Sequence, residues 1–261
     1  MTGLPARPWL FGPSTPVVGG GMGAGVPEAV LFDRDGTLVA DVPYNGDPER
    51  VEPLPTAREA VATVRARGVP VGVVSNQSGV ARGLLTYRQV DAVRQRVDAL
   101  FGPFDLWAVC PHGPDDGCGC RKPAPGLVLA ACARLGVRAS RTVVIGDIGS
   151  DLAAARAAGA RGVLVPTPVT RPEEITGADQ VAPDLATAVR LALDPATDGG
   201  HAAAADPGTR DGDGQAAAVA PETRGSHPAT ADPETRGSHP ATLDPGTGGG
   251  RPAAVTAGGR P

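Results

Sequence analysis

Between residues 28 and 194 the chain alternates short apolar runs with longer stretches in which apolar residues recur at helical spacing. The apolar runs predict strands at 29–33, 69–75, 104–110, 141–147 and 161–165. The helical stretches, most of them ending at a glycine, predict helices at 56–68, 87–102, 125–136 and 150–159. Strands that are apolar on both faces and alternate with helices indicate an α/β fold. We expect a Rossmann-like parallel sheet with helices on both faces.

The two ends of the chain lack this periodicity. Residues 1–27 are rich in Gly and Pro, and we expect them to form a flexible N-terminal arm. In the segment 195–261 a 12-residue unit, PETRGSHPATAD, recurs as PETRGSHPATLD with almost no apolar residues. Such a repeat cannot bury a core, so we expect a disordered tail. The folded domain should span 28–194, with gaps between strands too short for a separate cap domain.

Charge and composition narrow the class of partner. The formal net charge is −4 and both signs are mixed, so no basic stripe for nucleic acid is expected. No apolar run is long enough to cross a bilayer, and the N-terminus makes a poor signal peptide. We therefore expect a cytoplasmic monomer that acts on a small molecule.

Polar residues gather at the expected carboxyl ends of the strands, where ligands bind in such sheets. The strand ends supply Asp33, Asp35, Gly36, Thr37, Ser75, Asn76, Gln77, Lys122, Asp147 and Asp151. Crowded carboxylates repel unless a cation neutralises them, and Mg²⁺ prefers carboxylates together with a phosphate. A hydroxyl and an ammonium suit the other phosphoryl oxygens. One carboxylate can attack phosphorus, while a second acts as general acid and then general base.

A cluster of metal-binding residue types lies between 110 and 120. Cys110 and His112 form one pair, Cys118 and Cys120 another, and residues i and i+2 of an extended segment point the same way. Three thiolates and one imidazole make a closed tetrahedral site. This predicts a structural Zn²⁺ that holds the two ends of the loop together. The alternatives are a disulfide, which a cytosolic protein disfavours, and a set of reduced cysteines. Cys132 lies on an apolar helix face and is expected in the core.

These motifs together resemble the haloacid dehalogenase-like phosphohydrolase superfamily. The match consists of Asp-x-Asp-Gly-Thr at 33–37, a strand-end Ser75, Lys122 and the acidic motif at 147–151. The resemblance implies that Asp33 is the nucleophile and Asp35 the general acid/base. It also implies that Mg²⁺ is held by Asp33, the Asp35 carbonyl and Asp147, and that Ser75 and Lys122 hold the phosphoryl group. Because Ile148 follows Asp147, Asp151 is expected to orient Lys122 or to cap a helix.

Three segments narrow the resemblance to one subgroup. They are DRDGT at 33–37, SNQSGVARG at 75–83 and CPHGPDDGCGCRKPAPG at 110–126. They are similar to the D-glycero-D-manno-heptose 1,7-bisphosphate phosphatases and the related histidinol-phosphate phosphatases. The resemblance implies that Arg121 contacts the substrate. It also implies a substrate pocket lined by Asp41, Val42, Pro43, Tyr44, Ser75, Asn76, Gln77 and Ser78.

The function expected from this resemblance is Mg²⁺-dependent hydrolysis of a small phosphate ester through an aspartyl-phosphate. The 7-phosphate of heptose 1,7-bisphosphate is the first candidate, and histidinol phosphate is the alternative. A phospho-receiver domain also combines acidic residues, a hydroxyl and a Lys, but its phosphorylated Asp follows the third strand, which here ends at Cys110. A zinc-stabilised binding module without catalysis is the remaining alternative.

Overall fold

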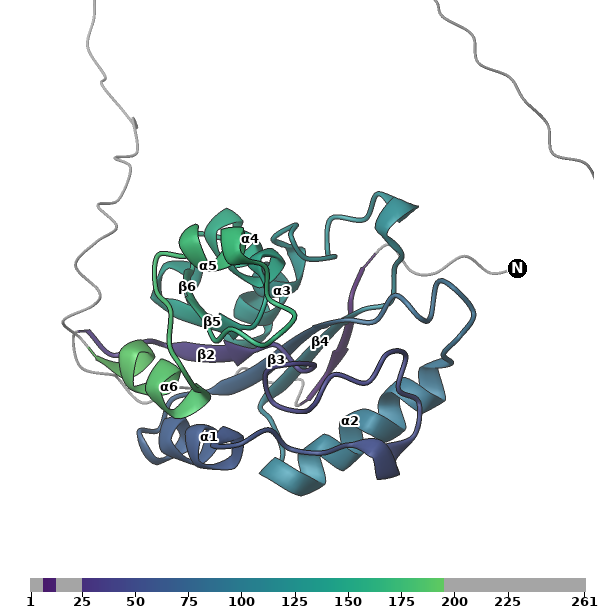
Figure 1. The fold of residues 1–261 in the computed structure, drawn as a ribbon, viewed down its shortest axis with the longest axis horizontal. Helices are drawn as coiled ribbons and strands as arrows, with labels where there is room; N and C mark the ends of the chain where they lie inside the picture. Colours follow the sequence, from purple (N-terminus) through teal and green to yellow (C-terminus); the bar gives the residue numbers. More distant parts are fainter. Residues whose placement is uncertain (1–6, 13–24, 195–261) are drawn as a thin grey trace, which may run out of the picture. The chain divides into compact units, whose positions relative to one another are not determined.

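The structure is a computed structural model that describes residues 7–12 and 25–194. In these residues a six-stranded sheet runs in the order β1-β4-β3-β2-β5-β6 (Figure 1). The strands are β1 (Trp9–Phe11), β2 (Ala29–Phe32), β3 (Val71–Asn76), β4 (Leu106–Cys110), β5 (Thr142–Gly146) and β6 (Arg161–Leu164). All neighbouring pairs are parallel except β1 with β4. The expected tail, 195–261, and most of the expected arm lie outside the described residues.

Helices cover both faces of the sheet (Figure 1). One face packs against α1 (Ala57–Ala66), α2 (Tyr87–Phe101) and α6 (Leu185–Leu193). The other packs against α3 (Gly126–Leu135) and α4 (Gly149–Ala157), with the short α5 (Pro172–Thr176) beside α4. Three single 3₁₀ turns complete the elements, at Pro48–Arg50, Pro114–Asp116 and Ala139–Arg141. The predicted α/β class is confirmed, and no cap domain lies between the strands within 25–194.

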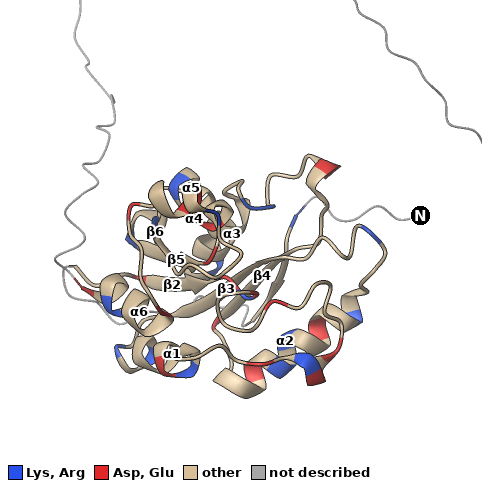
Figure 2. Cartoon of the chain, in the orientation of Figure 1, with Lys and Arg blue, Asp and Glu red and all other residues tan. Residues whose placement is uncertain are grey.

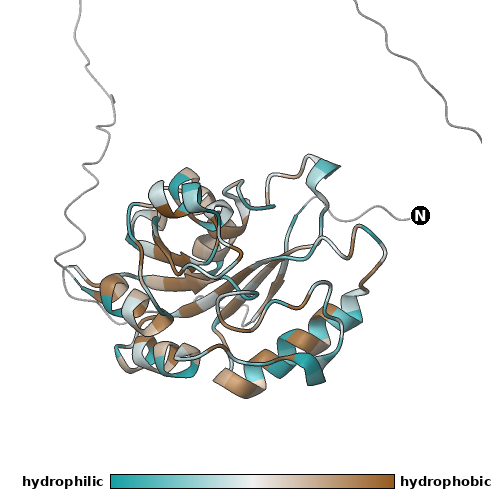
Figure 3. Cartoon of the chain, viewed as in Figure 1, coloured by the Kyte–Doolittle hydropathy of each residue, from teal (hydrophilic) through white to brown (hydrophobic). Residues whose placement is uncertain are grey.

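The alternation of side chains along β2 shows why the sheet is buried on both faces. Ala29 and Leu31 point toward α3 and α4, whereas Val30 and Phe32 point toward α1, α2 and α6. All four are fully buried. Apolar colouring accordingly runs through the central strands, while polar residues lie on the outer helix faces (Figure 3). Each strand must therefore be apolar throughout, which is the pattern in the sequence.

Local signals fix where α2 begins and ends. The Thr86 hydroxyl accepts a hydrogen bond from the Gln89 N–H at 3.3 Å, and the Gln89 side chain accepts one from the Thr86 N–H at 3.0 Å. This reciprocal pair is a capping box, which satisfies N–H groups that the first turn leaves free. The helix stops at Gly102, whose φ of +80° disfavours other residues.

Acidic and basic residues are interspersed along α2 (Figure 2).

The expectation of a flexible arm over 1–27 is wrong for Trp9–Phe11, which form an antiparallel edge strand on β4. The Trp9 and Phe11 rings lie 4.9 and 5.7 Å from the ring of Tyr87, and the Arg94 guanidinium lies 4.9 Å from that of Phe11. Only three residues lie between Pro8 and Gly12, and a segment this short shows no periodic pattern from which a strand could be predicted. The strand forms because β4 offers an unpaired edge and α2 offers aromatic and cationic partners.

No helix within residues 7–12 and 25–194 is both long enough and apolar enough to cross a membrane. The cytoplasmic location and the monomeric state remain predictions.

We expect Phe11→Ala to lower the free energy of unfolding by about 1–2 kcal/mol, because it removes a half-buried ring that contacts Tyr87 and Arg94. Leu10→Ala is the control, because Leu10 on the same strand is 37% exposed and should cost less than about 0.5 kcal/mol. Urea unfolding followed by circular dichroism measures both. Equal effects would contradict a stabilising role for the aromatic contacts.

Candidate active site

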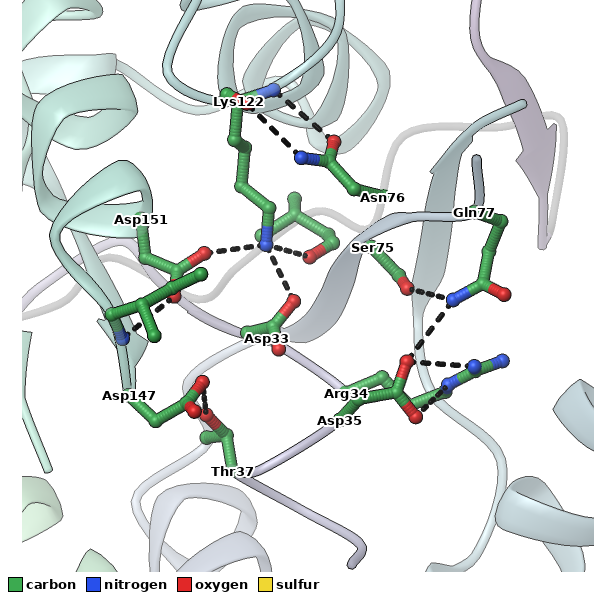
Figure 4. A network of polar contacts seen from close by, with 12 residues as sticks. Asp33, Arg34, Asp35, Thr37, Ser75, Asn76, Gln77, Lys122, Asp147 and Asp151 are labelled. Atoms are coloured by element: carbon green, nitrogen blue, oxygen red, sulfur yellow. Dashed lines mark hydrogen bonds and ion pairs between the residues drawn. The ribbon is translucent and has the colours of Figure 1, made fainter. Parts of the chain in front are cut away.

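The predicted polar residues meet at the carboxyl edge of the sheet, although they come from five separate segments (Figure 4). Asp33 and Asp35 follow β2, Ser75 and Asn76 end β3, and Asp147 follows β5. Asp151 lies in the first turn of α4, and Lys122 comes from the loop between β4 and α3. Parallel strands bring these ends to one edge because every crossover helix returns the chain to the opposite edge.

Lys122 is the central cation of the site and is only 4% exposed. Its Nζ contacts Asp33 Oδ1 at 2.5 Å and Asp151 Oδ1 at 2.6 Å, and donates to the Val74 carbonyl at 2.9 Å. Burial alone would lower the pKa of Lys122, but the Asp151 and Asp33 carboxylates outweigh it and raise the pKa. The ammonium therefore stays charged and ties β2, β3 and α4 together. Asp151 thus contacts Lys122, and its carboxylate also accepts from the Ile148 N–H at 3.3 Å. Its expected role in orienting Lys122 stays a prediction.

The acidic groups carry more negative charge than Lys122 can neutralise. Asp33, Asp147 and Asp151 are all buried, with carboxylate oxygens within 4.8 Å of one another. Burial raises the pKa of Asp33 well above its ordinary value despite the nearby Lys122. Burial, followed by the charge of Asp151, raises the pKa of Asp147 to about 7. If all three carboxylates ionise, the Lys122 ammonium leaves two negative charges uncompensated, and the raised pKa values reflect this excess. Oxygen donors, charge and burial therefore fit a divalent cation such as Mg²⁺.

Asp147 is held by two residues that lie far from it in sequence. The Thr37 hydroxyl donates to its carboxylate at 3.3 Å, and the Thr170 hydroxyl donates to its main-chain carbonyl at 2.6 Å. Gly36, at φ +74°, lets the first loop pass close beneath the carboxylate, since a Cβ there would lie 2.3 Å from Asp147 Oδ2. Thr170 was not anticipated, because it lies in an irregular loop after β6 without a motif.

Asp35 points away from Lys122 into a separate group of donors (Figure 4). Buried Arg34 donates to both of its carboxylate oxygens, through Nε at 2.9 Å and Nη2 at 2.7 Å. Gln77 donates to Asp35 at 3.1 Å and to the Ser75 hydroxyl oxygen at 2.9 Å. Arg34 was not anticipated as a partner of Asp35, because adjacent side chains of an extended segment are expected to point in opposite directions.

Asn76 contacts the Lys122 main chain. Its side-chain amide donates to the Lys122 carbonyl and accepts from the Lys122 N–H, both at 3.1 Å. These two bonds use one donor and one acceptor site of the Asn76 amide to fix the lysine loop. Its expected place in the lining of the substrate pocket stays a prediction. The peptide bond between Lys122 and Pro123 is cis.

The four predicted zinc ligands converge on one point. The three Sγ–Sγ distances are 3.3, 3.6 and 3.7 Å, and His112 Nδ1 lies 3.4 Å from Cys110 Sγ and 3.2 Å from Cys120 Sγ. Zn–S bonds of about 2.3 Å in a tetrahedron require S–S separations of about 3.7 Å, so the donor set fits zinc. Burial raises the pKa of Cys110, and that of Cys120 to about 11, so metal binding would have to displace thiol protons. Cys132 lies in the core, as expected.

The loops around this edge are joined to one another. The Ala81 N–H donates to the Pro111 carbonyl at 3.1 Å, which ties the 77–85 turn to the cysteine loop. Arg121 donates to the His112 carbonyl at 3.4 Å, and Arg82 donates to the Tyr44 hydroxyl at 2.7 Å. Partial removal from water and the nearby Asp35 charge raise the pKa of Asp41. The charge of Asp35 therefore acts on the pKa of Asp41, in the 41–44 segment.

Comparisons with known proteins agree with this geometry. A HAD-hydrolase-like family model matches residues 119–188. The D-glycero-β-D-manno-heptose-1,7-bisphosphate 7-phosphatase of Pseudomonas aeruginosa is 39% identical over 143 residues, covering 53% of this chain and 80% of the relative. The Escherichia coli K12 enzyme of the same name is 34% identical over 172 residues, covering 60% and 90%.

A solved structure matches the fold as well. It is the D,D-heptose 1,7-bisphosphate phosphatase of B. bronchiseptica in complex with magnesium and phosphate, at a TM-score of 0.58 and 32% identity. The match covers 64% of this chain and 98% of that one. Fold and site thus define a haloacid dehalogenase-like hydrolase of phosphoric monoesters, as the motifs predicted. Within that class, the chain belongs to the heptose 1,7-bisphosphate phosphatase family.

We expect Gly36→Ala to reduce phosphatase activity by at least about 100-fold, because the added Cβ would displace the Asp147 carboxylate. Gly68→Ala is the matched control. Its φ of +69° imposes the same backbone strain, but a Cβ there meets nothing within 4 Å. Phosphate release and thermal unfolding of both variants are the measurements. Equal losses of activity in the two variants would show that strain, and not the contact with Asp147, causes the effect.

Proposed function

We propose that this protein hydrolyses the 7-phosphate of D-glycero-D-manno-heptose 1,7-bisphosphate. The observation that carries the proposal is the convergence of Asp33, Asp35, Asp147 and Lys122 at one edge of the sheet, in a chain whose relatives carry that activity in their names. The phospho-receiver and binding-module alternatives have no comparable support.

In the first step, Asp33 attacks the phosphorus atom. A new bond forms between an Asp33 oxygen and phosphorus, and the bond from phosphorus to the sugar oxygen breaks. Asp35 gives its proton to that leaving oxygen, so the sugar departs as a neutral alcohol. These roles are the ones that the family resemblance implies. Asp33 lies beside the buried cation Lys122, whereas Asp35 lies outside that ion pair, against Arg34 and Gln77.

In the second step, Asp35 takes a proton from water as that water attacks phosphorus. The bond between phosphorus and Asp33 breaks, and inorganic phosphate leaves with the nucleophile restored. Lys122 and the Ser75 hydroxyl would hold phosphoryl oxygens through both steps and stabilise their growing negative charge. Lys122 suits this role because Asp151 and the Val74 carbonyl hold its charged ammonium and Asn76 holds its main chain, so little reorganisation is needed.

Asp33, the Asp35 main-chain carbonyl and Asp147 would hold Mg²⁺. When bound, this ion neutralises the excess carboxylate charge and polarises a phosphoryl oxygen. Thr37, Thr170 and Gly36 keep Asp147 in position, as their contacts show. Cys110, His112, Cys118 and Cys120 would hold Zn²⁺, which stabilises the loop that carries Arg121 and Lys122. Arg121 and the 41–44 and 75–78 segments would bind the rest of the substrate.

The substrate proposal predicts a higher kcat/KM for heptose 1,7-bisphosphate than for histidinol phosphate, by at least about tenfold, because Arg121 would contribute a charged contact to a second phosphate. Steady-state phosphate release on the two esters measures the ratio. Asp33→Asn should abolish turnover of both, which assigns the activity to this site. Higher efficiency on histidinol phosphate would overturn the proposal.

For the zinc loop, Cys118→Ser should reduce bound zinc and raise KM about tenfold, while the melting temperature falls by only a few degrees. The reason is that the cluster fixes the loop before Arg121, whereas Cys118 itself is only partly buried. Cys132→Ser is the control, since Cys132 is buried outside the cluster. Elemental analysis, kinetics and thermal unfolding measure these effects. A zinc-free variant with unchanged KM would refute the link between metal and substrate binding.

A further inference from the structure

Gln77 connects two groups that the reaction uses separately. It follows β3 directly, is 5% exposed, and its N–H donates to the Cys110 carbonyl at 2.7 Å. Its side-chain Nε2 lies 3.1 Å from Asp35 Oδ2 and 2.9 Å from Ser75 Oγ (Figure 4). One amide nitrogen thus touches both the general acid/base and the hydroxyl that faces the phosphoryl group.

The orientation of this amide follows from the chemistry of its neighbours. An ionised carboxylate only accepts hydrogen bonds, so the amide nitrogen, and not the oxygen, must face Asp35. The nitrogen carries two hydrogens, and Asp35 and Ser75 take one each. Ser75 Oγ is therefore an acceptor toward Gln77. Its own hydrogen must point elsewhere, and it is free to donate to a phosphoryl oxygen.

The same contacts show how the Asp35 carboxylate is held. Gln77 Nε2 and Arg34 Nη2 both donate to Oδ2, and Arg34 Nε donates to Oδ1. Gln77 thus holds the carboxylate of the general acid/base through Oδ2, and the same amide nitrogen contacts Ser75 Oγ.

We propose that Gln77 is a positioning residue, which directs the Ser75 hydrogen toward the phosphoryl group and fixes the orientation of the Asp35 carboxylate. This differs from the substrate-contact role that family resemblance implies for Gln77, and it rests on the proposed function of Asp35 as general acid. Loss of Gln77 should therefore impair protonation of the leaving group as well as phosphoryl binding. A residue that only contacts the sugar, or only supports the fold, would have no effect on leaving-group dependence.

The test compares phenyl phosphate with p-nitrophenyl phosphate, two esters without a sugar. Phenolate leaves poorly and needs the proton, whereas p-nitrophenolate leaves well without it. The kcat/KM value reports the first step, in which the leaving group departs. For Gln77→Met, which keeps the length of the side chain, we expect kcat/KM to fall about 100-fold on phenyl phosphate and only about tenfold on p-nitrophenyl phosphate. Gln95→Met, on the exposed face of α2, is the control and should change neither value.

A second variant tests whether a change in side-chain packing alone could explain the loss of activity. Gln77→Glu keeps the shape but supplies at most one hydrogen, so it cannot donate to both Asp35 and Ser75, and it should show the same selective loss. Equal losses on the two esters, wild-type kinetics of Gln77→Glu, or a raised KM for heptose 1,7-bisphosphate with unchanged ester selectivity would each overturn the proposal. Thermal unfolding confirms that each variant is folded. Failure of the wild type to hydrolyse heptose 1,7-bisphosphate would refute the proposed substrate and leave the aryl-ester comparison intact.

Discussion

The buried ammonium of Lys122 is the interaction on which the rest of the site depends. It contacts a residue after β2, a carbonyl of β3 and a residue of α4, so one charge joins three elements of the sheet edge. Without it, Asp33 and Asp151 would face each other buried and uncompensated, which is costly in a low-dielectric interior. The same charge would bind a phosphoryl oxygen. In the proposed reaction, one group would thus supply both the stability of the site and electrostatic catalysis.

A lysine can serve in this way only if its loop is fixed, and the loop is rich in Gly and Pro. Two separate sets of contacts fix the loop that carries Lys122. The Asn76 amide pairs with the main chain of Lys122 from the end of β3, and the Cys110–Cys120 cluster closes the loop from the end of β4. Both begin at neighbouring parallel strands, so the loop takes its position from the most rigid part of the fold.

The two carboxylates of the first motif illustrate how environment separates their roles. Asp33 lies beside Lys122 and two further acidic residues, where a metal ion would complete the charge balance. Asp35, two residues later, lies among Arg34 and Gln77 outside that cluster. The chain leaves β2 at Phe32 and turns at residues 34–37, so these two carboxylates enter different surroundings. In the proposed reaction, those surroundings would separate the nucleophile from the residue that exchanges protons.

The sequence by itself determined the α/β class, the strand ends that carry Asp33, Ser75 and Asp147, and the cysteine cluster, because these are written in local periodicity and short spacings. Tertiary structure alone decided the edge strand Trp9–Phe11 and the support of Asp147 by Thr170. It also decided the placing of Asp35 by Arg34 and Gln77. These features depend on hydrogen bonds and ring contacts whose partners are brought together only when the sheet forms, so no local pattern records them.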